Sequence, residues 1–167
     1  MNSSFDLGEV DDFATGALGE PGSRVFFLQA VRDNLVVTLR LEKQQVSTLA
    51  DYLQGVLTRM GVMMDTPHEA MPELREPIVA EWVVATLGIG HDESSDHLVI
   101  VAEELIPESV EKEAATARFL LGPEQALAFV EGARRVVAAG RPPCPICGHS
   151  MNPEGHVCPR SNGHGSD

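Results

Sequence analysis

A β-hairpin is predicted by two β-prone runs, Val25-Phe-Phe-Leu-Gln-Ala-Val31 and Leu35-Val-Val-Thr-Leu-Arg-Leu41. Asp33-Asn34 lies between them and suits a two-residue turn, because both residue types tolerate a positive φ. In the second run the alternate residues are all apolar, which predicts one buried face: Leu35, Val37, Leu39 and Leu41. This hairpin is the clearest one in the chain.

After Glu42 the apolar spacing changes to the three-and-four pattern of a helix. We predict a helix over residues 44–60, and Gly61 stands where a helix usually stops. Its single apolar stripe contains Val46, Leu49, Ala50, Leu53, Val56, Leu57 and Met60.

A second set of elements follows a connector, residues 63–77, which holds three prolines and no periodicity. Strand patterns resume over residues 78–89, 98–102 and 116–121, with Trp82 in the first of them. Pro123 opens a second helix, where its missing N–H does no harm, and this helix is expected to end at Gly140.

The two predicted helices share one stripe, since Ala126 falls on Val46 and Phe129 on Leu49 after a shift of 80. Each helix also follows about three strands, because a short strand is expected after Val10, before the Pro21-Gly22 turn. We therefore hypothesise a duplicated β-β-β-α unit, with Gln45 and Gln125 among the few identities. Two ordinary amphipathic helices would also share this spacing, so that alternative stays open.

These elements predict an α+β fold in which two amphipathic helices pack on antiparallel sheet. The expected organisation is an acidic domain over residues 1–140, with possible halves 1–62 and 78–140, followed by a small zinc-binding tail over residues 141–167.

The formal charge is -13, and the excess lies before residue 141, because Arg141 and Arg160 cancel Glu154 and Asp167. A body this acidic repels nucleic acid and anionic lipid, so a basic protein or a cation is the better partner. No apolar run approaches the roughly 20 residues that span a bilayer, and the first residues do not resemble a signal peptide. We expect a cytoplasmic protein.

The tail contains all three cysteines of the chain, a pattern that fits metal ligation in a reducing compartment. Cys144-Pro-Ile-Cys147-Gly148 can form a tight turn that brings two thiolates to one zinc ion. Cys158 is the expected third ligand and His156 the fourth, with His164 as the alternative to His156. Four protein ligands leave no open position, so the prediction is one structural zinc per chain. Reduced cysteines without metal are the simpler alternative.

Two other polar segments could carry function. His91-Asp92-Glu93 with Asp96-His97 could bind a divalent metal or transfer protons, although a solvated connection between strands explains it more simply. The acidic stretch of Glu103-Glu104 and residues 108–113 is usual for a solvated face but could receive a basic partner. The sequence has no Gly-x-Ser-x-Gly, His-Glu-x-x-His or P-loop motif.

Four segments resemble an uncharacterised family of actinobacterial proteins, a domain of unknown function: residues 19–30, 41–45, 141–148 and 155–163. The last two read Arg-Pro-Pro-Cys-Pro-Ile-Cys-Gly and Gly-His-Val-Cys-Pro-Arg-Ser-Asn-Gly. The resemblance implies a cytoplasmic bacterial protein and supplies no activity, substrate or cofactor.

The function is therefore unknown from the sequence. The leading hypothesis is a non-enzymatic, zinc-containing interaction or regulatory protein with a protein partner. The alternative is a hydrolase-type enzyme with a site between the two halves near His91 and His97. Nucleic-acid binding through the zinc tail is a third reading, disfavoured by the charge.

Overall fold

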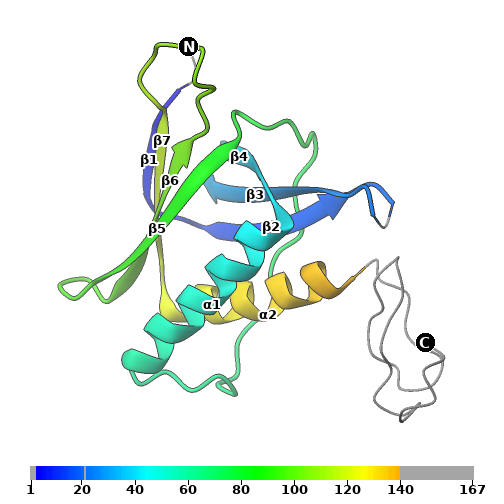
Figure 1. Ribbon diagram of the computed structural model, residues 1–167. Helices are drawn as coiled ribbons and strands as arrows, with labels where there is room; N and C mark the ends of the chain where they lie inside the picture. The colour runs from blue at the N-terminus through cyan, green and yellow to red at the C-terminus, as the bar shows by residue number, and fades with distance from the viewer. Residues whose placement is uncertain (1–2, 21, 140–167) are drawn as a thin grey trace, which may run out of the picture.

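The computed structural model describes residues 3–20 and 22–139. The predicted zinc ligands Cys144, Cys147, His156 and Cys158, and the alternative His164, lie outside the described residues. Seven strands and two helices follow in the order β1 Phe5–Glu9, β2 Asp12–Leu18, β3 Val25–Arg32, β4 Leu35–Leu41, α1 Lys43–Arg59, β5 Val84–Asp92, β6 His97–Glu104, β7 Thr116–Leu121 and α2 Pro123–Ala138 (Figure 1).

The predicted α+β class, hairpin and helices are confirmed. β3 and β4 pair antiparallel, and Asp33 in their turn has a φ of 54°. The Asp33 N–H donates to Asp11 Oδ2 at 2.7 Å, which fixes the turn to the start of β2. The stripe predicted for α1 is its buried face, because every member except Met60 is buried.

The largest differences from the predicted strands are the presence of β1 and the bounds of β5. β1 was not expected, because its five residues show no clear alternation and include Gly8 at a φ of 63°. It forms by parallel pairing with β7, a partner distant in sequence. The strand expected over residues 78–89 begins at Val84 and continues through His91 and Asp92, which were expected in a loop.

The chain contains the β-β-β-α unit twice. β2, β3 and β4 form one antiparallel sheet followed by α1, and β5, β6 and β7 form a second followed by α2. The strands pair in the same register in both units. Beside the first turn, Leu18 pairs with Val25 in the first unit and Asp92 with His97 in the second. Beside the helix, Phe26 pairs with Leu41 in the first unit and Leu98 with Leu121 in the second. This agreement favours duplication over a chance match of two helices.

The units exchange their helices. α2 packs against β2 of the first unit, α1 packs against β5 of the second, and the helices pack on each other (Figure 1). Each sheet also receives a parallel segment from the other unit, because β1 pairs with β7 and Val83 bridges Arg40 of β4. The core is therefore shared, and Phe13 of the first unit lies 4.8 Å from Phe129 of the second, between ring centroids.

Gln45, the third residue of α1, connects that helix to the other unit. Its Oε1 accepts the Glu42 N–H at 2.7 Å, which caps the helix start. Its Nε2 donates to Val84 O at 3.1 Å and Ala85 O at 3.2 Å, where β5 begins.

Gln125 repeats these contacts in α2. Its Oε1 accepts the Gly122 N–H at 3.0 Å, and its Nε2 donates to Val10 O at 2.8 Å and Asp11 O at 3.2 Å, just before and beside β2. Gln45 and Gln125, which are identical in the two predicted units, thus make equivalent contacts that join one unit to the other.

We predict that Gln45→Ala and Gln125→Ala each lower the free energy of unfolding by about 1 to 3 kcal/mol, because each leaves backbone groups unpaired at a unit junction. Urea denaturation would measure this. Gln44→Ala is the matched control, since this neighbouring side chain is exposed, and it should change stability by less than about 0.5 kcal/mol. Equal effects at positions 44 and 45 would contradict the role of Gln45.

Candidate binding surfaces

Each unit has a hollow between the first turns of a helix and the strand it packs on. The hollow on α2 and β2, here called the acidic cleft, has a volume of about 480 Å³. Residues 67–72 of the connector form its third wall. The cleft is bordered by four carboxylates: Asp11, Asp12, Glu69 and Glu124.

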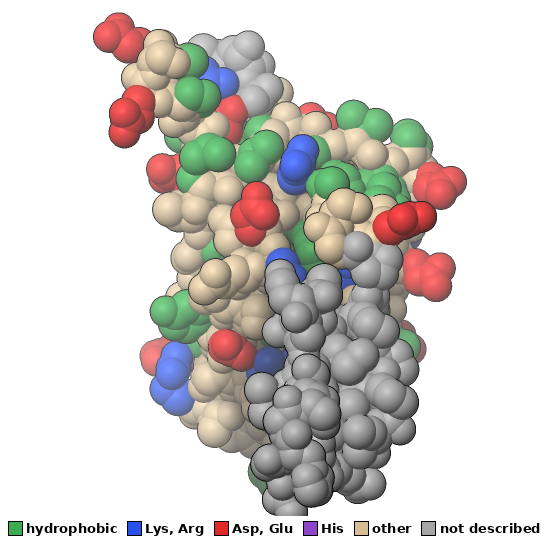
Figure 2. All heavy atoms as spheres, turned by 45° about the vertical axis from the view of Figure 1, so that its right-hand side comes forward, with side chains coloured by type: hydrophobic (Ala, Val, Ile, Leu, Met, Phe, Trp, Pro, Cys, Tyr) green, Lys and Arg blue, Asp and Glu red, His purple; other side chains and the backbone are tan. Residues whose placement is uncertain are grey.

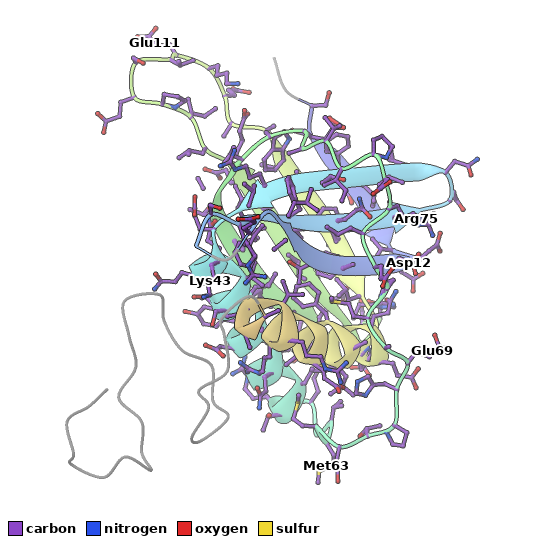
Figure 3. The ribbon with its side chains drawn as sticks, turned by 90° about the vertical axis from the view of Figure 1, so that its right-hand side faces the viewer. Asp12, Lys43, Met63, Glu69, Arg75 and Glu111 are labelled. Atoms are coloured by element: carbon purple, nitrogen blue, oxygen red, sulfur yellow. The ribbon has the colours of Figure 1, made fainter. Side chains whose placement is uncertain are left out.

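Two of these carboxylates are used within the fold. Asp12 forms an ion pair with Arg75 at 2.7 Å, and both lie on the same side of the molecule (Figure 3). Asp11 holds the β3–β4 turn. Glu69 and Glu124 are exposed and form no ion pair with another described residue. The cleft therefore offers two uncompensated carboxylates beside the apolar Phe13 and Ala128.

His68 fixes the connector at the mouth of this cleft. Its Nδ1 lies 2.8 Å from Thr66 O, and its Nε2 lies 2.7 Å from Glu131 Oε2 on α2. The histidine side chain is only 10% exposed. It is thus a structural contact that positions the acidic Glu69 next to it.

The corresponding hollow on α1 and β5, here called the open groove, is smaller, at about 150 Å³, and more apolar. Its walls are Gln44, Gln45, Thr48, Leu49 and Tyr52 of α1 and Ala85, Leu87 and Ile89 of β5. Tyr52 is 63% exposed, so a large aromatic side chain borders the groove in contact with solvent. None of the residues lining the open groove is acidic, in contrast to the acidic cleft.

His91 and His97 do not converge. His91 pairs with Leu98 across the strands, whereas Asp92 pairs with His97. Because adjacent residues in a strand point to opposite faces and paired residues share a face, the two histidines lie on opposite faces of the sheet.

Each histidine binds a different carboxylate. His91 Nε2 lies 2.9 Å from Asp96 Oδ1 at the turn, and His97 Nε2 lies 2.6 Å from Glu9 Oε1 on β1. Each histidine thus pairs with its own carboxylate, and the two do not form one shared site near His91 and His97, where the hydrolase-type alternative placed it.

Asp92 stabilises the β5–β6 turn. Hydrogen bonds from the Ser94 and Ser95 side chains lower the pKa of its carboxyl. Ser94 Oγ donates to Asp92 Oδ1 at 2.6 Å. Within residues 3–20 and 22–139, no group of three or more His, Cys, Asp or Glu side chains could hold a metal ion.

The acidic stretch predicted to be solvated contains one buried member. Glu104 is 5% exposed, accepts the Ala115 N–H at 3.1 Å and lies 3.1 Å from Lys112 Nζ. It anchors the loop that contains Glu108 and Glu111. On the face drawn in Figure 2, the Asp and Glu side chains lie at separate places rather than in one patch.

The acidic cleft was not predicted from the sequence. Its carboxylates come from β2, the connector and α2, three segments whose proximity depends on the helix exchange. The alignment of Gln45 with Gln125 indicated a repeat but not that α2 begins beside Asp11.

No helix in the described part of the chain has the length and apolarity needed to cross a membrane. No curated protein and no solved structure matches the sequence.

A family model described as a protein of unknown function (DUF3090) matches residues 5–158. The match spans both units and extends to Cys158, the last of the predicted cysteine ligands. It confirms the resemblance to an uncharacterised family, and it names no activity. The chain belongs to the DUF3090 family of proteins of unknown function.

Proposed function

We propose that this protein is a non-enzymatic interaction or regulatory protein of the bacterial cytoplasm, and that its acidic cleft binds a basic segment of a protein partner. The observation that carries this proposal is the cleft of about 480 Å³ with the exposed carboxylates Glu69 and Glu124. The exposed Pro67 and the half-buried Pro72 in the same lining would receive the methylene stems of Lys or Arg side chains.

The charge of the chain supports a basic partner over nucleic acid. A body with a formal charge of -13 attracts cationic segments and speeds their association, but repels phosphate. Lys and Arg can also supply the cations that Glu69 and Glu124 do not receive from other described residues.

The cysteine-rich tail supplies the second part of the proposal. We propose that Cys144, Cys147, Cys158 and His156 hold one structural zinc, with His164 as the alternative to His156. The support is the clustering of three thiols and three imidazoles after residue 140, which is the donor set that zinc prefers. A segment this short has almost no core, so bound metal would supply most of its folding free energy.

A fluorescein-labelled peptide rich in Lys and Arg tests the cleft. We expect binding at low salt that weakens by about two- to thirtyfold in the Glu69→Gln/Glu124→Gln variant, because exposed charges contribute about 0.2 to 1 kcal/mol each. Fluorescence anisotropy at two salt concentrations measures both the affinity and its screening.

Glu108→Gln/Glu111→Gln is the matched control for this binding. It removes the same charge from the loop that carries Glu111, far from Glu69 (Figure 3). The proposal requires that the control bind nearly as well as the unaltered chain. Equal losses in both variants would mean that only the net charge matters, and would overturn a specific cleft.

Elemental analysis tests the metal site on full-length protein purified without chelator or histidine tag. We expect one zinc per chain, lost in Cys144→Ser and His156→Ala because each removes one of four ligands. His164→Ala should retain the metal. The opposite result for the two histidines would assign His164 as the ligand, and no zinc in the unaltered protein would refute the site.

A further inference from the structure

The connector between the units covers the first sheet as well as the acidic cleft. A Cβ on Gly132 of α2 would meet Met71 Sδ at 2.6 Å, and a Cβ on Gly16 of β2 would meet Leu74 Cδ1 at 2.7 Å. These two glycines therefore provide the space in which the connector's apolar side chains pack.

The connector then crosses onto the middle strand of this sheet. The Arg75 N–H donates to Gln29 Oε1 at 2.7 Å, and Gln29 Nε2 donates to Arg75 O at 3.1 Å. Gln29 is 1% exposed under this cover. Figure 3 shows the connector running past Glu69 to Arg75, beside β2.

The second unit has the same surface without this cover. Gly90 of β5 pairs with Val99 as Gly16 of β2 pairs with Phe27, so the two glycines occupy equivalent positions. No heavy atom of the described residues outside the immediate neighbours lies within 4 Å of the place that a Cβ on Gly90 would take.

Two more positions repeat the contrast. Val101 of β6 occupies the position of the buried Gln29 and is 38% exposed. Tyr52 of α1 occupies the position of Gly132, by the shift that relates Gln45 to Gln125, and is 63% exposed. The open groove lies on one face of β5, and Gly90 and Val101 lie on the other face of the sheet. Together they match the places that the connector covers around β2 in the first unit.

The chain itself holds a segment in the right place to cover this surface. Residues 60–83 follow α1 and cover the first unit, and residues 139–167 follow α2 at the equivalent point. The second segment is the longer, and its formal charge is zero, which suits it to an acidic body. It contains the apolar residues Ile146, Met151 and Val157.

One apolar residue of the C-terminal segment corresponds in position to a residue of the connector. The shift of 80 that superposes the two helices in sequence places Met151 at the position of Met71. Since Met71 packs on Gly132, the equivalent contact for Met151 is with Tyr52.

We propose that the C-terminal segment, residues 140–167, packs along α1 and over the edge strand β5 of its own chain, with Met151 beside Tyr52. The segment would cover the open groove and Gly90 as the connector covers its own unit. Such a cover would also shield the edge strand β5 from pairing with other chains. This inference is independent of the partner proposed for the acidic cleft and of the zinc.

Photo-crosslinking in the full-length chain tests this docking. Tyr52 would be replaced by p-benzoylphenylalanine, which keeps an aromatic ring at an exposed position, and Val110 would be replaced in the control. After irradiation and digestion, mass spectrometry should find crosslinks from position 52 to the peptide around Met151, and none to residues 140–167 from position 110.

A mixture of isotope-labelled and unlabelled chains identifies the occupant. Crosslinks within one chain are expected. Crosslinks from position 52 that join two chains would show that a second copy occupies the groove. Crosslinks that do not reach residues 140–167 would show that the C-terminal segment does not occupy it. Either result would overturn the proposal.

Tyr52→Glu tests the same contact by limited trypsin digestion at Arg160, since the bond after Arg141 precedes Pro142 and resists trypsin. The substitution places a charge in the proposed contact, so cleavage of the segment should be several-fold faster than in the unaltered protein. Val110→Glu is the control, since it adds the same charge at an exposed site outside the groove. Equal cleavage rates in all three proteins would refute the docking.

Discussion

Two primary amides hold this structure together at equivalent joints. Gln45 and Gln125 each accept one backbone N–H at a helix start and donate to two carbonyls where the other unit's first strand begins. Glutamate has no N–H to donate, and asparagine is one methylene shorter, so neither can replace both contacts. Because each helix is tied to the opposite unit, the two units share one hydrophobic core.

The same joint produces different surfaces in the two units. Beside Gln125 stand Asp11 and Glu124, which make the acidic cleft; beside Gln45 the equivalent positions are Ala85 and Gln44, which make an uncharged groove. Both helix starts have the same glutamine contacts to the backbone, whereas the exposed side chains around the two glutamines differ. The connector increases this contrast, since it adds the carboxylate of Glu69 to the acidic cleft, whereas none of the residues that line the open groove comes from the connector.

The elements that could be predicted were those with strong local periodicity, such as α1 and the β3–β4 hairpin. β1 could not, because a five-residue strand with Gly8 in it depends on its distant partner β7. The exchange of helices was equally hidden, since an apolar stripe shows that a face is buried but not against which sheet. The acidic cleft forms because of that exchange. Each of its carboxylates could be read from the sequence, but their proximity could not be predicted.

The helix pair links the two surfaces mechanically. Arg134 of α2 contacts Asp51 and Gln54 of α1 where the helices meet, and the shift between the units places Gln54 and Arg134 at equivalent positions. α2 lines the acidic cleft, α1 lines the open groove, and each rests on a different sheet. A ligand that displaced α2 from β2 would therefore also disturb the packing of α1 on β5, because the helices share one interface and interiors are close-packed. The shape of each surface therefore depends on the same helix–helix interface.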